Sequence, residues 1–141
     1  MVVRHVRVKG YPKESVVAEK LHAMVRHAEL NSRMKDYYDL WLISEAFDFD
    51  GQSLQKAIET TFKKRDTELL IERPIALTVE FASVNQVRWS NFLKKMNFET
   101  NESNDFVNIS EKIWIFLHHP LQASINKIKS NHHWDPRKGW K

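Results

Sequence analysis

Two aspartates, Asp36 and Asp39, stand three residues apart in the stretch SRMKDYYDLWLI, whose other residues are mostly apolar or aromatic. On a helix, residues three apart lie on the same face, so both carboxylates would point the same way. Two like charges this close repel each other unless a cation joins them. Mg²⁺ suits the spacing, because this hard ion takes one or two protein carboxylates together with substrate phosphates. The pair is therefore the first candidate for chemistry in this chain.

A plainer interpretation stays open beside the metal site. The neighbouring cations Arg33 and Lys35 could neutralise Asp36 and Asp39 in an ion-pair cluster at the surface. The helix predicted over residues 33–47 is apolar around most of its circumference, which is typical of a central, buried helix. Charged side chains are seldom buried unless they are paired or used, so the surroundings of the pair favour a functional role.

Lys20 is the second candidate, within the string VVAEKLHAM. It lies at the border of the apolar stripe of a helix predicted over residues 13–29. Either its stem packs along apolar surface with the ammonium in solvent, or the ammonium is aimed at a phosphate. A short link joins this helix to the next, so the two should pack antiparallel, and contact between Lys20 and the aspartates is possible.

The other polar groups in the sequence are weaker candidates for a metal or phosphate site. Adjacent residues on a helix point apart, so the pairs His118–His119 and His132–His133 do not make two-ligand metal sites. The basic run Lys63–Arg65 closes a predicted helix, where the helix dipole explains it without a partner. The sequence has no Gly-rich phosphate loop and no HExxH motif.

The elements that must position these side chains are mostly helices. Alternation in VVRHVRVKGYP predicts one N-terminal strand, for which the rest of the sequence offers no partner. Ser83 with Gln86 forms a capping-box pattern ahead of a helix, and Pro120 should kink or restart the last one. The fold class predicted is mainly α, with about five helices and one N-terminal strand; the helices are expected over 13–29, 33–47 and 52–64, after Ser83, and from near Ser110, before a tail with no helical period.

Composition sets the limits of the function. The chain has 141 residues, of which 42% are hydrophobic, and it has no Cys, so thiolate zinc sites and structural disulfides are excluded. No apolar run approaches the length of a membrane span, which predicts a soluble, cytoplasmic protein without a membrane partner. The net charge of +4 is compatible with a phosphate-bearing partner.

Two motifs taken together resemble a known family. Tyr11, Pro12, Glu14 and the run Ala18–Lys20 fit the pattern Y-P-x-E-x-x-x-A-E-K, and residues 32–40 fit S-R-x-K-D-x-Y-D-L. This is similar to the C-terminal half of the AbiEii/AbiGii-type nucleotidyltransferase toxins, over roughly residues 5–120. The resemblance implies the C-terminal helical part of a polymerase-β-like nucleotidyltransferase. Members are the toxin half of toxin–antitoxin or abortive-infection modules, and they transfer nucleotides from NTP onto RNA, in studied members tRNA.

The resemblance also implies roles for single residues. Lys20 and Asp36 correspond to catalytic-site residues: Lys20 is expected to contact the nucleotide phosphates, and Asp36 is the candidate metal ligand. Arg33 and Lys35 are further candidates for nucleotide binding, and Asp39 and Glu19 for support. Mg²⁺ is the cofactor expected of the complete enzyme, and NTP, RNA and an antitoxin protein are its expected partners.

The chain departs from the family at its beginning. The Gly-rich strand turn and the D-x-D metal pair of the family come before the first matched motif, and no D-x-D precedes residue 11 here. We therefore expect residues 1–12 to be a strand remnant of the nucleotidyltransferase core, residues 13–128 a helical domain and residues 129–141 a tail. We expect this chain alone to be inactive. The alternative is a non-enzymatic helical module that contacts a protein partner such as an antitoxin.

Overall fold

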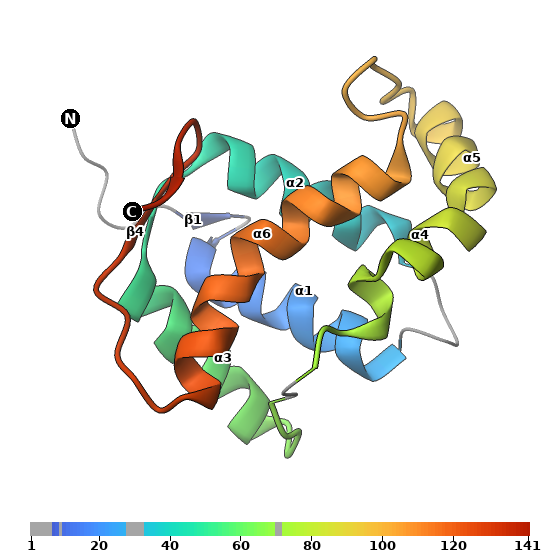
Figure 1. Ribbon diagram of the computed structural model, residues 1–141. Helices are drawn as coiled ribbons and strands as arrows, with labels where there is room; N and C mark the ends of the chain where they lie inside the picture. Colours follow the sequence, from blue (N-terminus) through green and yellow to red (C-terminus); the bar gives the residue numbers. More distant parts are fainter. Residues whose placement is uncertain (1–6, 9, 28–32, 70–71) are drawn as a thin grey trace.

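The computed structural model describes residues 7–8, 10–27, 33–69 and 72–141, and within these ranges the protein is mainly helical, as predicted (Figure 1). Among these described residues, six α-helices and one 3-10 helix form, where about five helices were expected, and five strands of two or three residues accompany them. The helices are α1 (Lys13–His27), α2 (Met34–Ala46), α3 (Gly51–Lys64), η1 (Ile75–Leu77), α4 (Val79–Val84), α5 (Gln86–Met96) and α6 (Phe106–Ile125).

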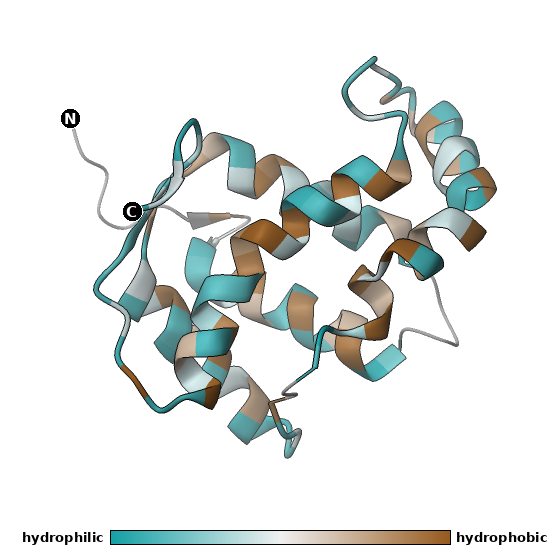
Figure 2. Cartoon of the chain, in the orientation of Figure 1, coloured by the Kyte–Doolittle hydropathy of each residue, from teal (hydrophilic) through white to brown (hydrophobic). Residues whose placement is uncertain are grey.

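The hydrophobic core gathers around α6. This helix crosses the middle of the view in Figure 1, with α3 near its C-terminal end and α4 and α5 near its N-terminal end. It packs against α2, α3 and α4, while α1 packs most extensively against α3. Figure 2 shows hydrophobic residues recurring along α6 where it passes the other helices. The largest fully buried side chains include Trp89, Phe49, Phe106, Phe116 and Leu21.

Helix α6 starts earlier than predicted and does not restart at Pro120. Its first residue is Phe106, four residues before the expected start near Ser110. Asp105 caps the helix, because its carboxylate accepts hydrogen bonds from the backbone N–H groups of Val107 and Asn108. Pro120 lies inside the helix and has no N–H to give to the carbonyl of Phe116, four residues before it. The indole of Trp140 donates to that carbonyl at 2.9 Å instead, so the helix continues with its free acceptor satisfied.

The C-terminal residues form strands that the sequence analysis did not predict. Strand β4 (His133–Asp135) pairs antiparallel with both β3 (Phe49–Asp50) and β5 (Gly139–Trp140). Trp134 is buried against Phe116, with ring centroids 4.9 Å apart, and its indole donates to the carbonyl of Ser44 at 2.8 Å. This C-terminal segment is therefore packed on the core beside α6.

The N-terminal strand has a partner, contrary to expectation. Strand β1 (Arg7–Val8) pairs antiparallel with β2 (Tyr11–Pro12) through a tight turn. Gly10 has a φ of +85° in that turn, a conformation that glycine adopts without strain. The prediction of an unpaired strand was wrong, because Gly10 and Pro12 were taken as the end of the strand, whereas Tyr11 and Pro12 pair back with Val8 and Arg7. The part of the strand prediction that falls on residues 1–6 and 9 lies outside the described residues.

The predicted capping box is also wrong. Ser83 lies inside α4, whose cap is Thr78, and Asn85 is the first residue before α5. Gln86 turns away to the start of α6, where its side chain accepts from the backbone N–H of Phe106 and donates to the carbonyl of Asn104. The side chain thus joins α5 to the loop before α6, a long-range contact that a local pattern does not reveal.

Candidate functional site

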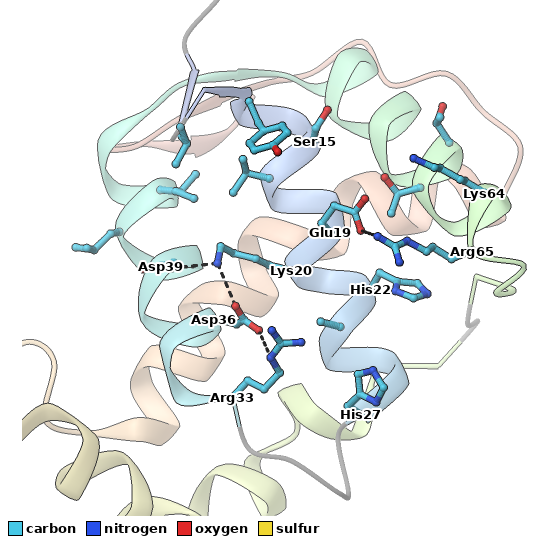
Figure 3. Close-up of a pocket in the computed structure, with 18 residues that line it drawn as sticks. Ser15, Glu19, Lys20, His22, His27, Arg33, Asp36, Asp39, Lys64 and Arg65 are labelled. Atoms are coloured by element: carbon cyan, nitrogen blue, oxygen red, sulfur yellow. Dashed lines mark hydrogen bonds and ion pairs between the residues drawn. The ribbon is translucent and has the colours of Figure 1, made fainter. Parts of the chain in front are cut away.

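A pocket of about 940 Å³ opens between α1, α2 and α3 (Figure 3). Helix α1 runs through the middle of the view, with residues of α2 on one side of it and residues from the end of α3 on the other. The side chains that surround the pocket fall into three groups: a charged cluster on α1 and α2, a second polar wall on α1 and α3, and an apolar end.

The charged cluster exists because two helices bury their apolar faces against the core. On α1, Val17 and Leu21 are buried, which leaves Lys20 at the edge of that stripe. On α2, Tyr37 and Leu40 are buried, and Asp36 and Asp39 share the polar strip that remains. Packing α1 on α2 then brings the lysine of one helix to the aspartates of the other.

Lys20 lies between the two carboxylates. Its ammonium donates to Oδ1 of Asp36 at 3.0 Å and to Oδ2 of Asp39 at 3.0 Å, as the dashed lines in Figure 3 show. The cation that joins the two like charges within the protein is therefore this ammonium. The contact between Lys20 and the two aspartates, which the sequence left open, is therefore present, and all three side chains line this pocket.

Two more cations complete the cluster from α2 and the residue before it. Lys35 donates to both oxygens of Asp39, at 2.8 and 2.9 Å, and Arg33 Nε lies 3.1 Å from Oδ2 of Asp36. That Asp36 oxygen is buried and has an ion-pair partner but no well-aligned hydrogen bond. Three cations and two carboxylates give the cluster a net charge of +1 (3 − 2), which favours an anion at its open side.

The contacts shift the pKa values of Lys20 and Asp39 in the direction that favours the charged form of each. Burial by itself would lower the pKa of Lys20, but its hydrogen bonds to Asp39 and Asp36 outweigh this, so the pKa is raised above its ordinary value. Burial would raise the pKa of Asp39, but Lys35 and Lys20 lower it below the usual range. Lys20 and Asp39 are thus both held charged.

The second polar wall lies across α1 from the cluster. Glu19 accepts from Arg65, at the end of α3, at 2.9 Å, and Nε2 of His22 lies 2.8 Å from Oγ1 of Thr67. Burial and the nearby Arg65 lower the pKa of His22, so the ring favours its neutral form. Glu19 therefore pairs with Arg65 on this wall. Glu19 and Asp39, the two predicted supporting residues, lie on opposite sides of Lys20 (Figure 3).

The apolar end of the pocket is formed by the N-terminal hairpin and by α1 and α2. Its lining side chains are Val8, Tyr11, Val16, Leu42 and Ile43. Tyr11 is 67% exposed, so its side chain is accessible to a ligand. No role was predicted for Tyr11 beyond its place in the first motif; the signal for one is an aromatic residue directly after Gly10, next to Pro12.

One comparison with known proteins identifies the family of this chain. The family model described as "Nucleotidyl transferase AbiEii toxin, Type IV TA system" matches residues 4–122. The chain belongs to the AbiEii toxin family. The match covers β1 to most of α6 and includes the whole charged cluster, so the protein is of the toxin–antitoxin nucleotidyltransferase kind. The comparisons with curated proteins and with solved structures give no match for this chain.

The cluster of this AbiEii family member is a poor metal site by itself. Within the described ranges, no group of three or more His, Cys, Asp or Glu side chains is arranged to hold a metal ion. Three of the four carboxylate oxygens of Asp36 and Asp39 accept hydrogen bonds from lysines, and only Oδ2 of Asp36 has none. Asp36 as a Mg²⁺ ligand stays a prediction, and it would require further ligands such as nucleotide phosphates.

The histidines gather where the sequence analysis did not place them together. His119 of α6 lies against His132, with ring centroids 4.5 Å apart, and its Nε2 lies 2.6 Å from Oγ of Ser130. Burial first, then His132 and His118, lower the pKa of His119. This pair joins α6 to the C-terminal segment, away from the charged cluster.

In the part of the chain that the structure describes, no helix is long and apolar enough to cross a membrane.

Proposed function

We propose that the pocket between α1, α2 and α3 binds a nucleoside triphosphate, and that the chain supplies the helical part of an enzyme that transfers nucleotides from NTP to RNA. The acceptor class proposed is tRNA, the compartment the cytoplasm, and the setting a toxin whose antitoxin is a protein partner. The family supports the nucleotidyltransferase kind, and the contacts of the charged cluster support the nucleotide as ligand.

The observation that carries the proposal is the position of Lys20 between Asp36 and Asp39. A lysine ammonium has three donors, and two of them are taken by the carboxylates at 3.0 Å. The carboxylates therefore hold the ammonium in one place and keep it protonated. Lys20 is the residue proposed to contact the phosphates, with Asp36 and Asp39 holding it in position and Asp36 closest to the reacting groups.

Arg33 and Lys35 extend the positive charge outward from Lys20. Their side chains are about half exposed, at 48% and 47%, so each keeps donors for a ligand while it holds one aspartate. A guanidinium can bind a phosphate with two parallel N–H groups, which suits Arg33 for the outer phosphates. The triphosphate is thus proposed to lie along Lys20 and Arg33.

The apolar end gives the nucleotide a direction. A nucleobase has an apolar π-face, and the exposed ring of Tyr11, with Val16 and Leu42 nearby in the lining, offers a surface for stacking. The base is therefore proposed to lie at the Tyr11 end and the phosphates at the Lys20 end. The polar wall with His22 and Thr61 remains for the ribose hydroxyls.

We propose further that this chain alone does not carry out the transfer. Phosphoryl-type transfer needs metal ions to hold the triphosphate and to activate the attacking hydroxyl. The aspartates of the cluster are already compensated by Lys20, Lys35 and Arg33, and this leaves them little capacity for metal ions. Binding of NTP by the chain alone is expected near millimolar, because a few partly exposed charges contribute modestly.

The test is a titration of the labelled chain with ATP and with inorganic triphosphate, followed by NMR. Shifts should appear at the backbone amides near Lys20, Arg33 and Asp36, and Lys20→Met should weaken binding of both ligands at least fivefold. Lys129→Met, an exposed lysine after α6, is the matched control and should leave binding unchanged. No shifts up to about ten times the expected millimolar dissociation constant would overturn the proposal and favour the alternative, a helical module that binds a protein.

A second measurement addresses activity. The purified chain is incubated with labelled NTP, Mg²⁺ and total tRNA. No label is expected in RNA. Incorporation of label that Lys20→Ala abolishes would contradict the proposed inactivity of the chain alone while supporting the site.

A further inference from the structure

A second, shallow and widely open groove, of about 540 Å³, lies between the start of α2 and one face of α5. Four of its lining side chains are cations, and among the described residues that line it none is acidic. Asn91 and Phe92 lie on the α5 side between the cations. Its lining includes Arg33, Lys35, Arg88, Asn91, Phe92 and Lys95.

We propose that this basic groove binds the sugar-phosphate backbone of a single-stranded nucleic acid. Under the proposed function, on which this identification rests, the strand is the end of the acceptor RNA. Three features of the groove support this ligand: the spacing of its cations, the groups between them and its continuity with the nucleotide pocket.

The cations on α5 form one row. Arg88, Asn91, Phe92 and Lys95 are spaced i, i+3, i+4 and i+7, so they lie on one face of the helix. With a rise of 1.5 Å per residue, Arg88 and Lys95 are separated by about 10 Å along the helix axis. Both are exposed, as is Asn91. Charges repeated along a line suit a ligand that carries its own charges at regular intervals, such as a phosphodiester chain.

The groups between the cations suit a nucleotide strand better than a simple anion. Phe92 is half-buried and is held by Tyr38, Trp89 and Phe98, whose ring centroids lie 5.7 to 6.2 Å from its own. A fixed aromatic side chain beside a basic groove is the combination by which proteins hold single-stranded nucleic acids without reading their sequence. Asn91 adds a donor and an acceptor for a sugar hydroxyl or a base edge.

Arg33 joins the groove to the nucleotide pocket, because it lines both. It also lies 3.1 Å from Asp36, the aspartate that holds Lys20. A strand that follows α5 toward Arg33 therefore ends beside the proposed phosphate site. This is the arrangement that a transfer of a nucleotide to the end of an RNA requires.

The test measures RNA binding without nucleotide. A fluorescent single-stranded RNA of mixed sequence is titrated with the full chain at several salt concentrations, and anisotropy is recorded. The double variant Arg88→Gln/Lys95→Gln should weaken binding at least tenfold at low salt. It should also reduce the slope of log K against log salt by about 1.4, the value for two lost phosphate contacts on a single strand.

Two controls separate the groove from the total charge and from the nucleotide pocket. Lys127→Gln/Lys129→Gln also removes two positive charges, but from the segment after the C-terminal end of α6, and should leave the RNA affinity within twofold of the wild type. Arg88→Gln/Lys95→Gln should leave the ATP titration unchanged, and circular dichroism should show both variants folded. If the chain bound RNA through the groove but did not bind ATP, the proposed nucleotide site would be wrong and the proposed RNA-binding groove would still stand.

Three results would overturn the inference. Unchanged RNA affinity in Arg88→Gln/Lys95→Gln would show that the groove does not bind RNA. An equal loss in Lys127→Gln/Lys129→Gln would show that only net charge matters. Stronger binding of a poly-glutamate peptide than of RNA, lost in the groove variant, would assign the groove to an acidic protein segment.

Discussion

The ammonium of Lys20 on α1 lies 3.0 Å from Oδ1 of Asp36 on α2, sixteen residues further along the chain. Both side chains are largely withdrawn from solvent, at 20% and 10% exposure. The same ammonium reaches Asp39, so one cation compensates two carboxylates that would otherwise repel each other. Lys20 therefore joins the two helices and holds the charge balance of the pocket, and stability and ligand binding should depend on it together.

Lys20→Met is expected to lower the free energy of unfolding by about 2 kcal/mol, because it leaves two partly buried carboxylates without their shared donor. Methionine keeps the length of the stem, so the loss reports on charge and hydrogen bonds. Urea unfolding followed by circular dichroism measures it. Adding Asp36→Asn and Asp39→Asn should restore part of the loss, since the like charges are then gone.

Lys35→Met is the control for this change. Lys35 also pairs with Asp39, but its side chain is 47% exposed and the pair is an i, i+4 contact within α2. Such pairs contribute about 0.5 kcal/mol. An equal loss in Lys20→Met and Lys35→Met would show that the position of Lys20 between two aspartates has no special effect on stability.

The charged cluster could be predicted from the sequence because its causes are local. Periodicity places Asp36 and Asp39 on one face, and the short link between two amphipathic helices makes contact with Lys20 possible. The partner of Glu19 could not be predicted in this way, because Arg65 comes from the end of α3 and depends on how α1 packs against it. The basic run Lys63–Arg65 had a sufficient local explanation in the helix dipole, which concealed its contact with the pocket.

The C-terminal strands were missed for a different reason. They have two or three residues each, so no alternation is long enough to be detected. What holds them is long-range: Trp134 donates to Ser44, and Trp140 donates to the carbonyl that Pro120 leaves free in α6. The sequence shows a proline in a helical pattern and a tryptophan near the end of the chain, but nothing in it predicts that the tryptophan bonds the carbonyl that the proline leaves free.

The contact between Trp140 and Phe116 leads to a second prediction. Trp140→Phe removes the indole donor and should cost about 1 kcal/mol, because the Phe116 carbonyl is left without a partner. In a Pro120→Ala background the new N–H can bond that carbonyl, so the same change should cost less. The unfolding free energies of the wild type, Trp140→Phe, Pro120→Ala and the double variant give the coupling energy between the two positions, expected at about 0.5 kcal/mol or more. Additive losses would show that Pro120 and Trp140 act independently.

A third prediction concerns the direction of the nucleotide in the pocket. Tyr11→Ala should weaken binding of ATP at least threefold, because the stacking surface for the base is lost. Binding of inorganic triphosphate, which has no base, should not change. Tyr11→Phe keeps the ring and is the matched control. An equal loss for both ligands in Tyr11→Ala would contradict a base at this end.

The fourth prediction is a pH dependence at the C-terminal segment, where His119 contacts His132, Ser130 and Trp140. The pKa of His119 is lowered in the folded protein, so folding favours the neutral ring. The stabilisation from this group is therefore complete above the unfolded pKa of 6.5 and is lost as the pH falls through the folded pKa. Protonation would place a positive charge against His132 and weaken the hold of α6 on the segment.

Hydrogen exchange measures this effect at the backbone. The amides of His133 and Lys141 bond to each other's carbonyls at 3.0 Å, so their protection factors report on the segment. Protection should fall between pH 7.5 and 5, and His119→Gln, which cannot titrate, should make the fall shallower. His133 of the same segment lies 3.2 Å from Asp48, a contact that the wild type and His119→Gln share. The same fall in the wild type and in His119→Gln would show that another group controls the segment.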